Sequence, residues 1–219
     1  MDSLIFDMDG TLWDNVDSYV IVWNKALEKT GHKNRVTRYD LLGLMGKEAR
    51  VMLDVIIPDT TIEEQDHLFD EVIAEYQKLQ GSMTPIVYDG VYEGLERLAK
   101  RYKLFMLSNC EEGGLINFMN HTRTTHLFED YMEHGMNLQP KHHNLRLLIE
   151  KHGLKSTVYV GDTDSDAVQS AIAGVPFVFV TYGFGDTDKY TLKFDSFPEL
   201  TNYFLDSKIQ DSKIQSSGL

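Results

Sequence analysis

The segment SLIFDMDGT at residues 3–11 is the part of the sequence that decides the fold. Its first four residues, Ser3–Phe6, predict a short buried strand that runs directly into a turn carrying Asp7 and Asp9. In open parallel sheets, ligands bind just beyond the carboxyl ends of the strands. The turn at residues 7–11 is accordingly the first candidate for a functional site.

After Pro85 the chain alternates between helical patterns and short apolar runs. The predicted helices are Val91–Arg101, Glu111–His121, Lys141–His152 and Asp164–Ala173. The predicted strands are Lys103–Leu107, Tyr131–Glu133, Thr157–Val160 and Phe177–Val180. This alternation predicts an α/β fold with a Rossmann-like parallel sheet at its core.

The region between the first strand and Pro85 has a different pattern. Apolar residues recur at helical spacing in Asn15–Lys29, Leu41–Leu44, Ala49–Ile57 and Ile62–Leu79. No strand pattern is visible between Trp13 and Ser82. The sequence therefore predicts an all-helical domain inserted into the α/β core.

The composition is that of a globular protein, with 219 residues of which 42% are hydrophobic and 25% charged. Lys and Arg total 21 against 34 Asp and Glu, which gives a net charge of −13. So acidic a chain is not expected to bind nucleic acid or an anionic membrane through bulk electrostatics. It can still bind an anionic small molecule where cations are concentrated locally.

Three features of the sequence indicate the cellular location of the protein. No run approaches the ~20 apolar residues that a membrane span needs, and Met1–Ser3 lack the basic region of a signal peptide. Cys110 is the single cysteine, which fits a reducing compartment. These features predict a cytoplasmic protein. The pentapeptide Asp-Ser-Lys-Ile-Gln occurs twice in residues 206–215 and predicts a frayed or loosely helical terminus.

Four polar clusters follow the predicted strands or begin a helix between them, and a parallel sheet brings them to one edge. They are Asp7-x-Asp9-Gly10-Thr11, Ser108-Asn109, Lys141 and Asp162-x-x-x-Asp166. Clustered carboxylates are costly unless a cation neutralises them, and Mg²⁺ is held by oxygens while keeping positions for water and phosphate. One carboxylate can act as a nucleophile and a second as a general acid. The clusters therefore favour a Mg²⁺-dependent phosphoryl-transfer enzyme.

These four clusters, in this order, resemble the four motifs of the haloacid dehalogenase (HAD) superfamily, and the resemblance extends over essentially the whole chain. The helical insert resembles the small α-helical cap of the subfamily that contains phosphoglycolate phosphatases, β-phosphoglucomutases and haloacid dehalogenases. The resemblance implies a HAD core domain formed by residues 1–12 and 85–219, with a helical cap domain at residues 13–84.

The resemblance also implies roles for the first motif. Asp7 would be the nucleophile that attacks phosphorus and would also be a Mg²⁺ ligand. Asp9 would protonate the leaving group and then deprotonate the hydrolytic water, and its main-chain carbonyl would bind the metal. Thr11 would support the turn.

The other three motifs are implied to bind the phosphoryl group and the metal. Ser108 and the backbone N–H of Asn109 would hydrogen-bond the transferring group, and Lys141 would bridge Asp7 and the phosphoryl oxygens. Asp162 would be the main carboxylate ligand of Mg²⁺ from the fourth motif. Asp166 would ligate the ion or orient it through water.

Two further segments are candidates for substrate recognition or support. Lys47, after Gly46 at a turn in the insert, is a candidate cation for a substrate carboxylate or a second phosphate, because caps of this family place a loop over the active site. A solvated lysine at a helix start explains it equally simply. The segment at residues 182–185, Tyr-Gly-Phe-Gly, resembles one found in phosphoglycolate-phosphatase-like proteins, although a flexible glycine-rich turn is the alternative.

Other chemistries fit the residues less well. Asp162, Asp164 and Asp166 have the spacing that opens a calcium-binding EF-hand loop, but Ala167 and Ala173 stand where that loop needs Gly and Glu. The single cysteine has no visible histidine partner, and the eight histidines form no zinc-binding pattern.

The function that these patterns favour is a Mg²⁺-dependent phosphatase acting on a small phosphorylated metabolite, similar to phosphoglycolate phosphatases. Asp9 argues against dehalogenation, which has no leaving oxygen to protonate. A β-phosphoglucomutase-like mutase is less favoured because mutases of this group resemble Glu-Asp-Ser where this chain has Gly161-Asp162-Thr163. A pyrophosphatase and a non-catalytic binding protein with the same fold stay open, and a monomer or a homodimer is expected.

Overall fold

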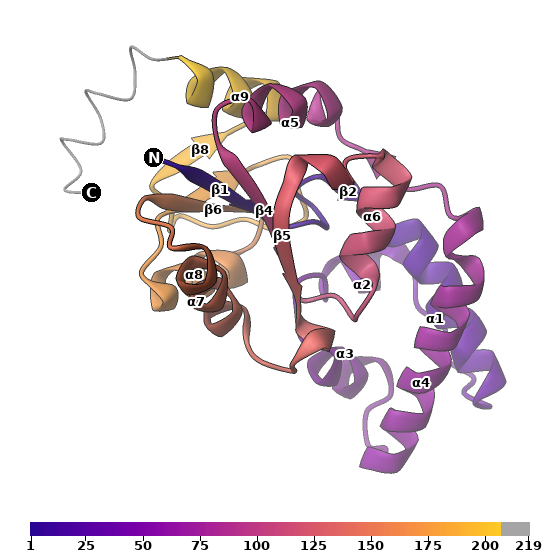
Figure 1. Ribbon diagram of the computed structural model, residues 1–219. Helices are drawn as coiled ribbons and strands as arrows, with labels where there is room; N and C mark the ends of the chain where they lie inside the picture. Colours follow the sequence, from indigo (N-terminus) through magenta and orange to yellow (C-terminus); the bar gives the residue numbers. More distant parts are fainter. Residues whose placement is uncertain (207–219) are drawn as a thin grey trace. The chain divides into compact units, whose positions relative to one another are not determined.

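The computed structural model describes residues 1–206 of the chain (Figure 1). It divides into two compact units, the first made of Met1–Leu12 with Val87–Leu219 and the second of Trp13–Ile86. The repeated pentapeptide lies outside the described residues except for its first aspartate, and so does the expectation of a loosely helical terminus. The two units are described separately.

The first unit is built on a parallel sheet that contains six strands in the described residues, in the order β5-β4-β1-β6-β7-β8. The strands are β1 (Ser3–Phe6), β4 (Lys103–Ser108), β5 (Phe128–Glu133), β6 (Thr157–Gly161), β7 (Phe177–Val180) and β8 (Leu192–Phe194). Every neighbouring pair is parallel. The predicted α/β fold with a Rossmann-like core is confirmed.

Helices cover both faces of this sheet (Figure 1). They are α5 (Val91–Ala99), α6 (Gly114–Thr122), α7 (Lys141–His152), α8 (Asp164–Ala173) and α9 (Phe197–Leu205), with short 3-10 turns at Thr125–Leu127 and His134–Met136. Side chains alternate along each strand. Ile5, Phe105 and Tyr159 point to one face and pack with Leu145 and Leu148 of α7.

The opposite face of the sheet is covered by α5, α6 and α9. The rings of Phe6 in β1 and Phe197 in α9 lie 6.0 Å apart, and Phe194 of β8 packs against Phe204 at 6.1 Å. Because β1 is buried between two layers and flanked by β4 and β6, the end of β1 is held at a fixed place in the sheet. The functional turn follows this strand.

Two elements of the first unit are absent from the sequence prediction. Strand β8 is a three-residue edge strand, too short to show an alternating pattern, and α9 follows it directly. The signals for α9 were present, since Ser196 caps the helix by accepting a hydrogen bond from Glu199 N and a proline lies in the first turn. Helix α6 begins at Gly114 rather than at residue 111, because Gly113, with φ of 95°, is the residue before it.

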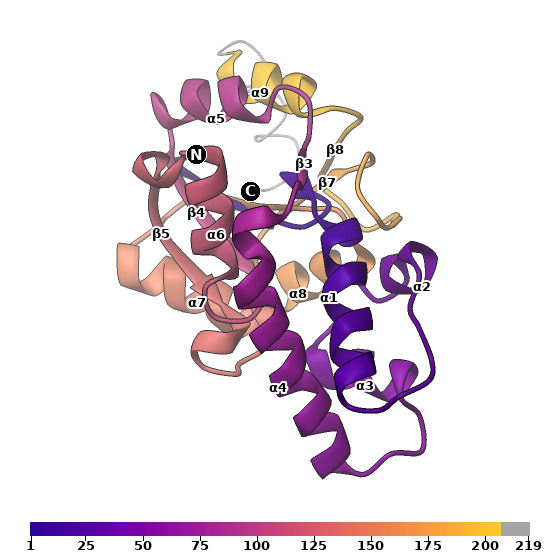
Figure 2. The ribbon, with the colours of Figure 1, turned by 90° about the vertical axis from the view of Figure 1, so that its right-hand side faces the viewer.

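The second unit contains α1 (Val16–Lys29), α2 (Arg38–Leu42), α3 (Ala49–Ile56), α4 (Ile62–Leu79) and a 3-10 turn at Gln80–Ser82. Helices α1 and α4 lie side by side (Figure 2), with the rings of Tyr19 and Tyr76 6.1 Å apart. The prediction of a segment without strands is wrong at Trp13–Asp14, because these residues form β2, which pairs with β3 (Ile86–Val87). A two-residue strand carries no periodic signal.

No helix in the described part of the chain combines the length and the apolar character needed to cross a bilayer.

Glu75 of α4 links the two long helices of the second unit. It is 5% exposed, and its Oε1 lies 2.5 Å from Lys29 Nζ and 2.9 Å from Lys78 Nζ. The hydrogen bonds from Lys29 and Lys78 lower the pKa of Glu75 from 4.5 to about 2. A carboxylate with a depressed pKa stabilises the folded protein above its unfolded-state pKa, and this contribution is lost as the pH falls through the folded-state value.

We therefore expect Glu75→Gln to lower the melting temperature by a few degrees at neutral pH. The difference from the wild type should shrink as the pH falls from about 4.5 to about 2. Thermal melts over that range check this, with Glu71→Gln, which removes a single more exposed pair with Lys29, as the milder control. A difference that is independent of pH would contradict the assignment.

Candidate active site

The strand ends bring the first, second and fourth motifs together. Asp7 follows β1, Ser108 ends β4 and Asp162 follows β6, and β4 and β6 are the two neighbours of β1 in the sheet. In register, Phe6 of β1 pairs with Met106 of β4 and with Val160 of β6. The three side chains therefore leave the sheet at the same edge, as parallel pairing requires.

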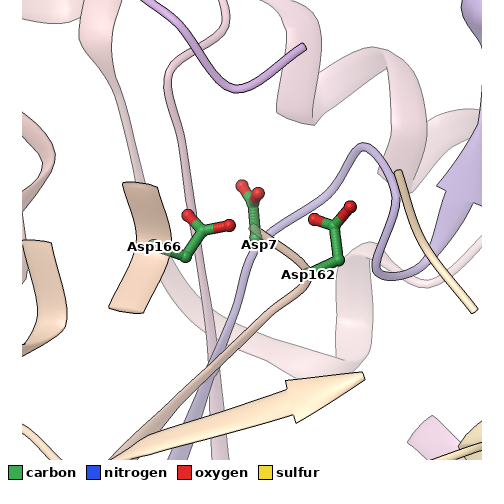
Figure 3. Close-up of side chains that lie close together, drawn as sticks. All are labelled: Asp7, Asp162 and Asp166. Carbon is green, nitrogen blue, oxygen red and sulfur yellow. The ribbon is translucent and has the colours of Figure 1, made fainter. Parts of the chain in front are cut away.

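Three buried carboxylates form the centre of this edge. Asp7, Asp162 and Asp166 are 4%, 0% and 1% exposed, and one oxygen from each lies within 4.8 Å of the others. Figure 3 shows Asp7 between the other two, with all three carboxylates turned to the same side. This arrangement is suited to holding a cation.

Lys141 provides the positive side chain of the cluster. It begins α7 after Pro140, is 2% exposed, and its Nζ lies 2.6 Å from Asp166 Oδ1 and 3.2 Å from Asp7 Oδ1. Burial alone would lower the pKa of Lys141, but the charges of Asp166 and Asp7 outweigh it and raise the pKa. The ammonium group is therefore held in its charged form beside Asp7.

One ammonium does not neutralise three carboxylates. Burial raises the pKa of Asp7 to about 7 against the opposing effect of Lys141, and Asp166 adds to the rise. Burial and the charges of Asp166 and Asp7 raise the pKa of Asp162 well above its ordinary value. In addition, Asp7 Oδ1 is buried, and its ion pair with Lys141 Nζ at 3.2 Å lacks hydrogen-bond geometry. The cluster thus keeps an excess of negative charge that a further cation would neutralise.

The turn after β1 packs directly onto Asp162. Gly10 has φ of 80°, and a Cβ there would lie 2.0 Å from Asp162 Oδ2, so no other residue fits this turn. Thr11, fully buried, places its hydroxyl 3.4 Å from Asp162 Oδ1. Asp9, directly before Gly10 in this turn, is half-buried.

Asp166 is engaged by protein donors through both oxygens. Its Oδ1 accepts from Lys141 Nζ and lies 3.3 Å from the hydroxyl of Tyr159, and its Oδ2 accepts from Thr163 N at 3.1 Å and Thr163 Oγ1 at 2.6 Å. Thr163 and Asp166 form the capping box of α8. Asp166 therefore fixes Lys141 relative to the start of α8.

The segment after β7 supports the cluster from the side of Asp162. Phe184 N donates to Asp162 Oδ2 at 2.7 Å, and the Tyr182 hydroxyl donates to the carbonyl of Thr11 at 2.9 Å. A Cβ on Gly183 would lie 2.3 Å from Asp162 Cβ. This segment is thus part of the site rather than a free turn, and its two glycines were the signal in the sequence.

The residues after β4 complete the edge. Ser108 is 5% exposed, its Oγ accepts from Cys110 N at 3.3 Å, and Asn109 is half-buried. Burial, with the charges of Glu133 and Asp9, raises the pKa of the Cys110 thiol well above its ordinary value. A thiol held neutral in this way is a poor nucleophile, which disfavours cysteine chemistry.

Lys47 belongs to the second unit. It is exposed, and its N–H donates to Leu44 O at 3.1 Å in the turn between α2 and α3. Nearby Arg50 is committed to its own unit, because it donates to Gln65 Oε1 at 2.7 Å and pairs with Asp66 at 2.6 Å. Both side chains are exposed, and Lys47 is the better candidate of the two to contact a ligand, because the guanidinium of Arg50 is bound to side chains of its own unit.

Comparisons with known proteins place this site in a family. A family model described as "Haloacid dehalogenase-like hydrolase" matches residues 4–180. The phosphoglycolate phosphatase of Agrobacterium fabrum is 28% identical over 211 residues, covering 90% of this chain and 89% of that protein. The phosphoglycolate phosphatase of Xanthomonas campestris is 27% identical over 207 residues, covering 88% and 90%.

Solved structures share the fold. A haloacid dehalogenase-like family hydrolase from Streptococcus pneumoniae superimposes with a TM-score of 0.80 at 16% identity, covering 93% of this chain and 98% of that chain. The match to the family model spans the turn after β1, the end of β4, Lys141 and the acidic residues after β6. The chain therefore belongs to the haloacid dehalogenase-like hydrolases, and it resembles the phosphatases of that family.

Proposed function

We propose that the protein is a Mg²⁺-dependent phosphatase that hydrolyses a small phosphomonoester through an aspartyl-phosphate on Asp7. The observation that carries this proposal is the position of Asp7, at the end of the middle of three neighbouring strands, between Lys141 and two further buried carboxylates. The named relatives, which are phosphoglycolate phosphatases, support a substrate of that kind.

The residues at the strand ends fit Mg²⁺. The excess of buried negative charge and the all-oxygen donor set are the features that this ion requires. Asp7, Asp162 and the main-chain carbonyl of Asp9 would hold it, with Asp166 contributing directly or through water. When bound, Mg²⁺ would neutralise charge on the transferring phosphoryl group.

In the first step, a carboxylate oxygen of Asp7 forms a bond to phosphorus while the bond from phosphorus to the leaving oxygen breaks. Asp9 gives its proton to that oxygen, and the product alcohol leaves. Asp9 suits this role because it follows Asp7 by two residues in the same turn and is half-buried. Lys141 favours the ionised form of Asp7 against the burial that raises its pKa, and it would contact the phosphoryl oxygens during transfer.

In the second step, water attacks the phosphorus of the aspartyl-phosphate while Asp9 takes the proton of the water. Phosphate leaves and the Asp7 carboxylate is restored. Throughout, the Ser108 hydroxyl and the N–H of Asn109 would hydrogen-bond the equatorial oxygens of the transferring group. Asp166 has the supporting task of holding Lys141 in place.

The second unit, Trp13–Ile86, is proposed to act as a cap that selects the substrate, with Lys47 as the cation for a carboxylate or a second phosphate. A mutase and a pyrophosphatase would use the same core residues, and a non-catalytic binding protein would need neither the nucleophile Asp7 nor the general acid Asp9. The cytoplasmic location and the monomeric or homodimeric state stay predictions.

Phosphate release from a panel of substrates tests the proposal. The panel contains 2-phosphoglycolate, β-glucose-1-phosphate, pyrophosphate, nucleotides and an aryl phosphate, each with Mg²⁺ and with EDTA. We expect release that EDTA abolishes and that is fastest for a small phosphomonoester. No release from any member would contradict the phosphatase, and isomerisation of the sugar phosphate without release would identify a mutase.

Gly183→Ala tests the metal site independently of turnover. Its Cβ would lie 2.4 Å from both Asp162 Oδ2 and Gly10 O, so Asp162 must move. Displacing the supports of a metal ligand typically weakens binding by about 10- to 100-fold, so we expect a Mg²⁺ dissociation constant raised at least about tenfold in a calorimetric titration. Gly174→Ala, which strains a left-handed residue in open space, is the control and should bind Mg²⁺ normally. Unchanged binding in Gly183→Ala would remove Asp162 from the metal site.

A further inference from the structure

Glu133 is a buried carboxylate that the proposed mechanism does not use. It is the last residue of β5, is 1% exposed, and pairs in register with Ser108 of β4. Its Oε2 accepts from Gly113 N at 2.8 Å and its Oε1 from Leu115 N at 2.5 Å. One carboxylate therefore binds two backbone N–H groups at the start of α6.

This contact determines which anion the N-terminus of α6 binds. The exposed N–H groups and the helix dipole at such an end attract anions. Here the anion is the protein's own Glu133, bound through both oxygens, so the start of α6 is already satisfied internally. In the proposed mechanism the phosphoryl group is bound by Ser108 and Asn109, which begin the loop that leads to α6.

The same loop is held at a second point by the 3-10 turn that follows β5. Gly135 N donates to Cys110 O at 3.2 Å, and a Cβ on Gly135 would lie 2.3 Å from Glu112 N. Cys110 N in turn contacts Ser108 Oγ at 3.3 Å. The loop between Ser108 and α6 is thus held between the end of its own strand and Glu133, with its backbone in direct contact with the 3-10 turn that follows β5.

We propose that Glu133 is a positioning residue for phosphoryl transfer, which holds the loop so that the Ser108 hydroxyl and the Asn109 N–H meet the transferring group. The inference rests on the proposed phosphatase function. Glu133 touches neither substrate nor metal in this account. It acts through the backbone of residues 110–115.

The test compares Glu133→Gln with the wild type. The amide keeps the shape of the side chain but replaces one of the two acceptor oxygens with an NH₂ group that faces a backbone N–H. Small misplacements of positioning groups cost up to about a hundredfold in rate, so we expect kcat to fall at least about tenfold. Inhibition by vanadate, an oxyanion that occupies the position of the transferring phosphoryl group, should weaken by a similar factor.

Three comparisons separate positioning from stability. Mg²⁺ binding by calorimetric titration should be unchanged, because Glu133 contacts none of the carboxylates of the cluster. Tyr102→Phe removes a buried hydrogen bond to Phe204 O, of 2.6 Å, at the other end of β4 and should lower the melting temperature without lowering kcat. The effects of Glu133→Gln and Ser108→Ala should be non-additive in the double variant, since both act at one group of donors.

Normal kcat and vanadate inhibition in a less stable Glu133→Gln protein would overturn the inference while leaving the phosphatase intact. Strictly additive effects with Ser108→Ala would overturn it as well. If Glu133→Gln does not fold, Glu133→Asp is tested in its place. Its side chain keeps both acceptor oxygens but is shorter, so the same losses of kcat and of vanadate inhibition are expected. A wild-type protein that releases no phosphate would overturn both proposals together.

Discussion

Asp7→Asn is expected to reduce phosphate release by at least about a thousandfold. An amide has the shape of the carboxylate but does not attack phosphorus, so the loss is chemical and not steric. The fold should survive, because the substitution removes one of three buried carboxylates whose mutual repulsion and burial raise the pKa of Asp7 to about 7. We expect a melting temperature in EDTA that equals or exceeds that of the wild type.

Steady-state phosphate release and thermal melts check this prediction. Asp164→Asn is the matched control, because Asp164 is an exposed carboxylate of the same region that pairs with Lys189 at 2.9 Å and lies outside the cluster. It should leave turnover unchanged. Turnover of Asp7→Asn within about tenfold of the wild type would remove Asp7 as the nucleophile.

Lys141→Met should lower both the stability of the protein and kcat, because Lys141 contacts two carboxylates of the site. The ammonium group is the positive partner of both Asp7 and Asp166 in a region almost free of solvent. Removing one partner of a buried ion pair typically costs about 3–5 kcal/mol, and we expect a loss of this order in the metal-free protein. We also expect kcat to fall by at least about a hundredfold, because the phosphoryl oxygens lose a cation.

Mg²⁺ should partly restore the stability of Lys141→Met, because the ion supplies the missing positive charge. Its stabilising effect should therefore exceed that seen in the wild type, measured as the difference between melts with Mg²⁺ and with EDTA. Lys189→Met, which removes an exposed lysine bound to Asp164, is the control and should change neither quantity. A Lys141→Met protein as stable as the wild type in EDTA would contradict the electrostatic account of the cluster.

The elements that the sequence predicts best are those with strong local patterns. Strand β1, helices α7 and α8 and strand β7 have the predicted bounds, since each combines a continuous apolar stripe or run with a clear start. The three-residue β8 and the two-residue β2 could not be predicted from periodicity, because they exist only through pairing with distant strands.

The candidate site also contains residues that the sequence predicts and contacts that it does not. The acidic residues of the first and fourth motifs are visible in the sequence because they follow apolar strands directly. The supports are less visible, because they act through backbone groups far apart in the chain. Phe184 N reaches Asp162 across 22 positions, and only the glycines on either side of Phe184 mark this segment in the sequence. Glu133 reaches Gly113 N across 20 positions, and no residue type indicates that contact. Lys141 was identifiable from its order in the chain, but its pairing with Asp166 is known only from the structure.

The covalent intermediate on Asp7 is the central feature of the proposed mechanism, and it can be observed directly. The wild-type protein would be mixed with Mg²⁺ and the fastest substrate of the panel, quenched in acid during turnover and digested for mass spectrometry. We predict one phosphoryl group on the peptide that carries Asp7, located on Asp7 itself and absent in the EDTA control. Continued phosphate release with that peptide unmodified at every quench time would contradict the mechanism.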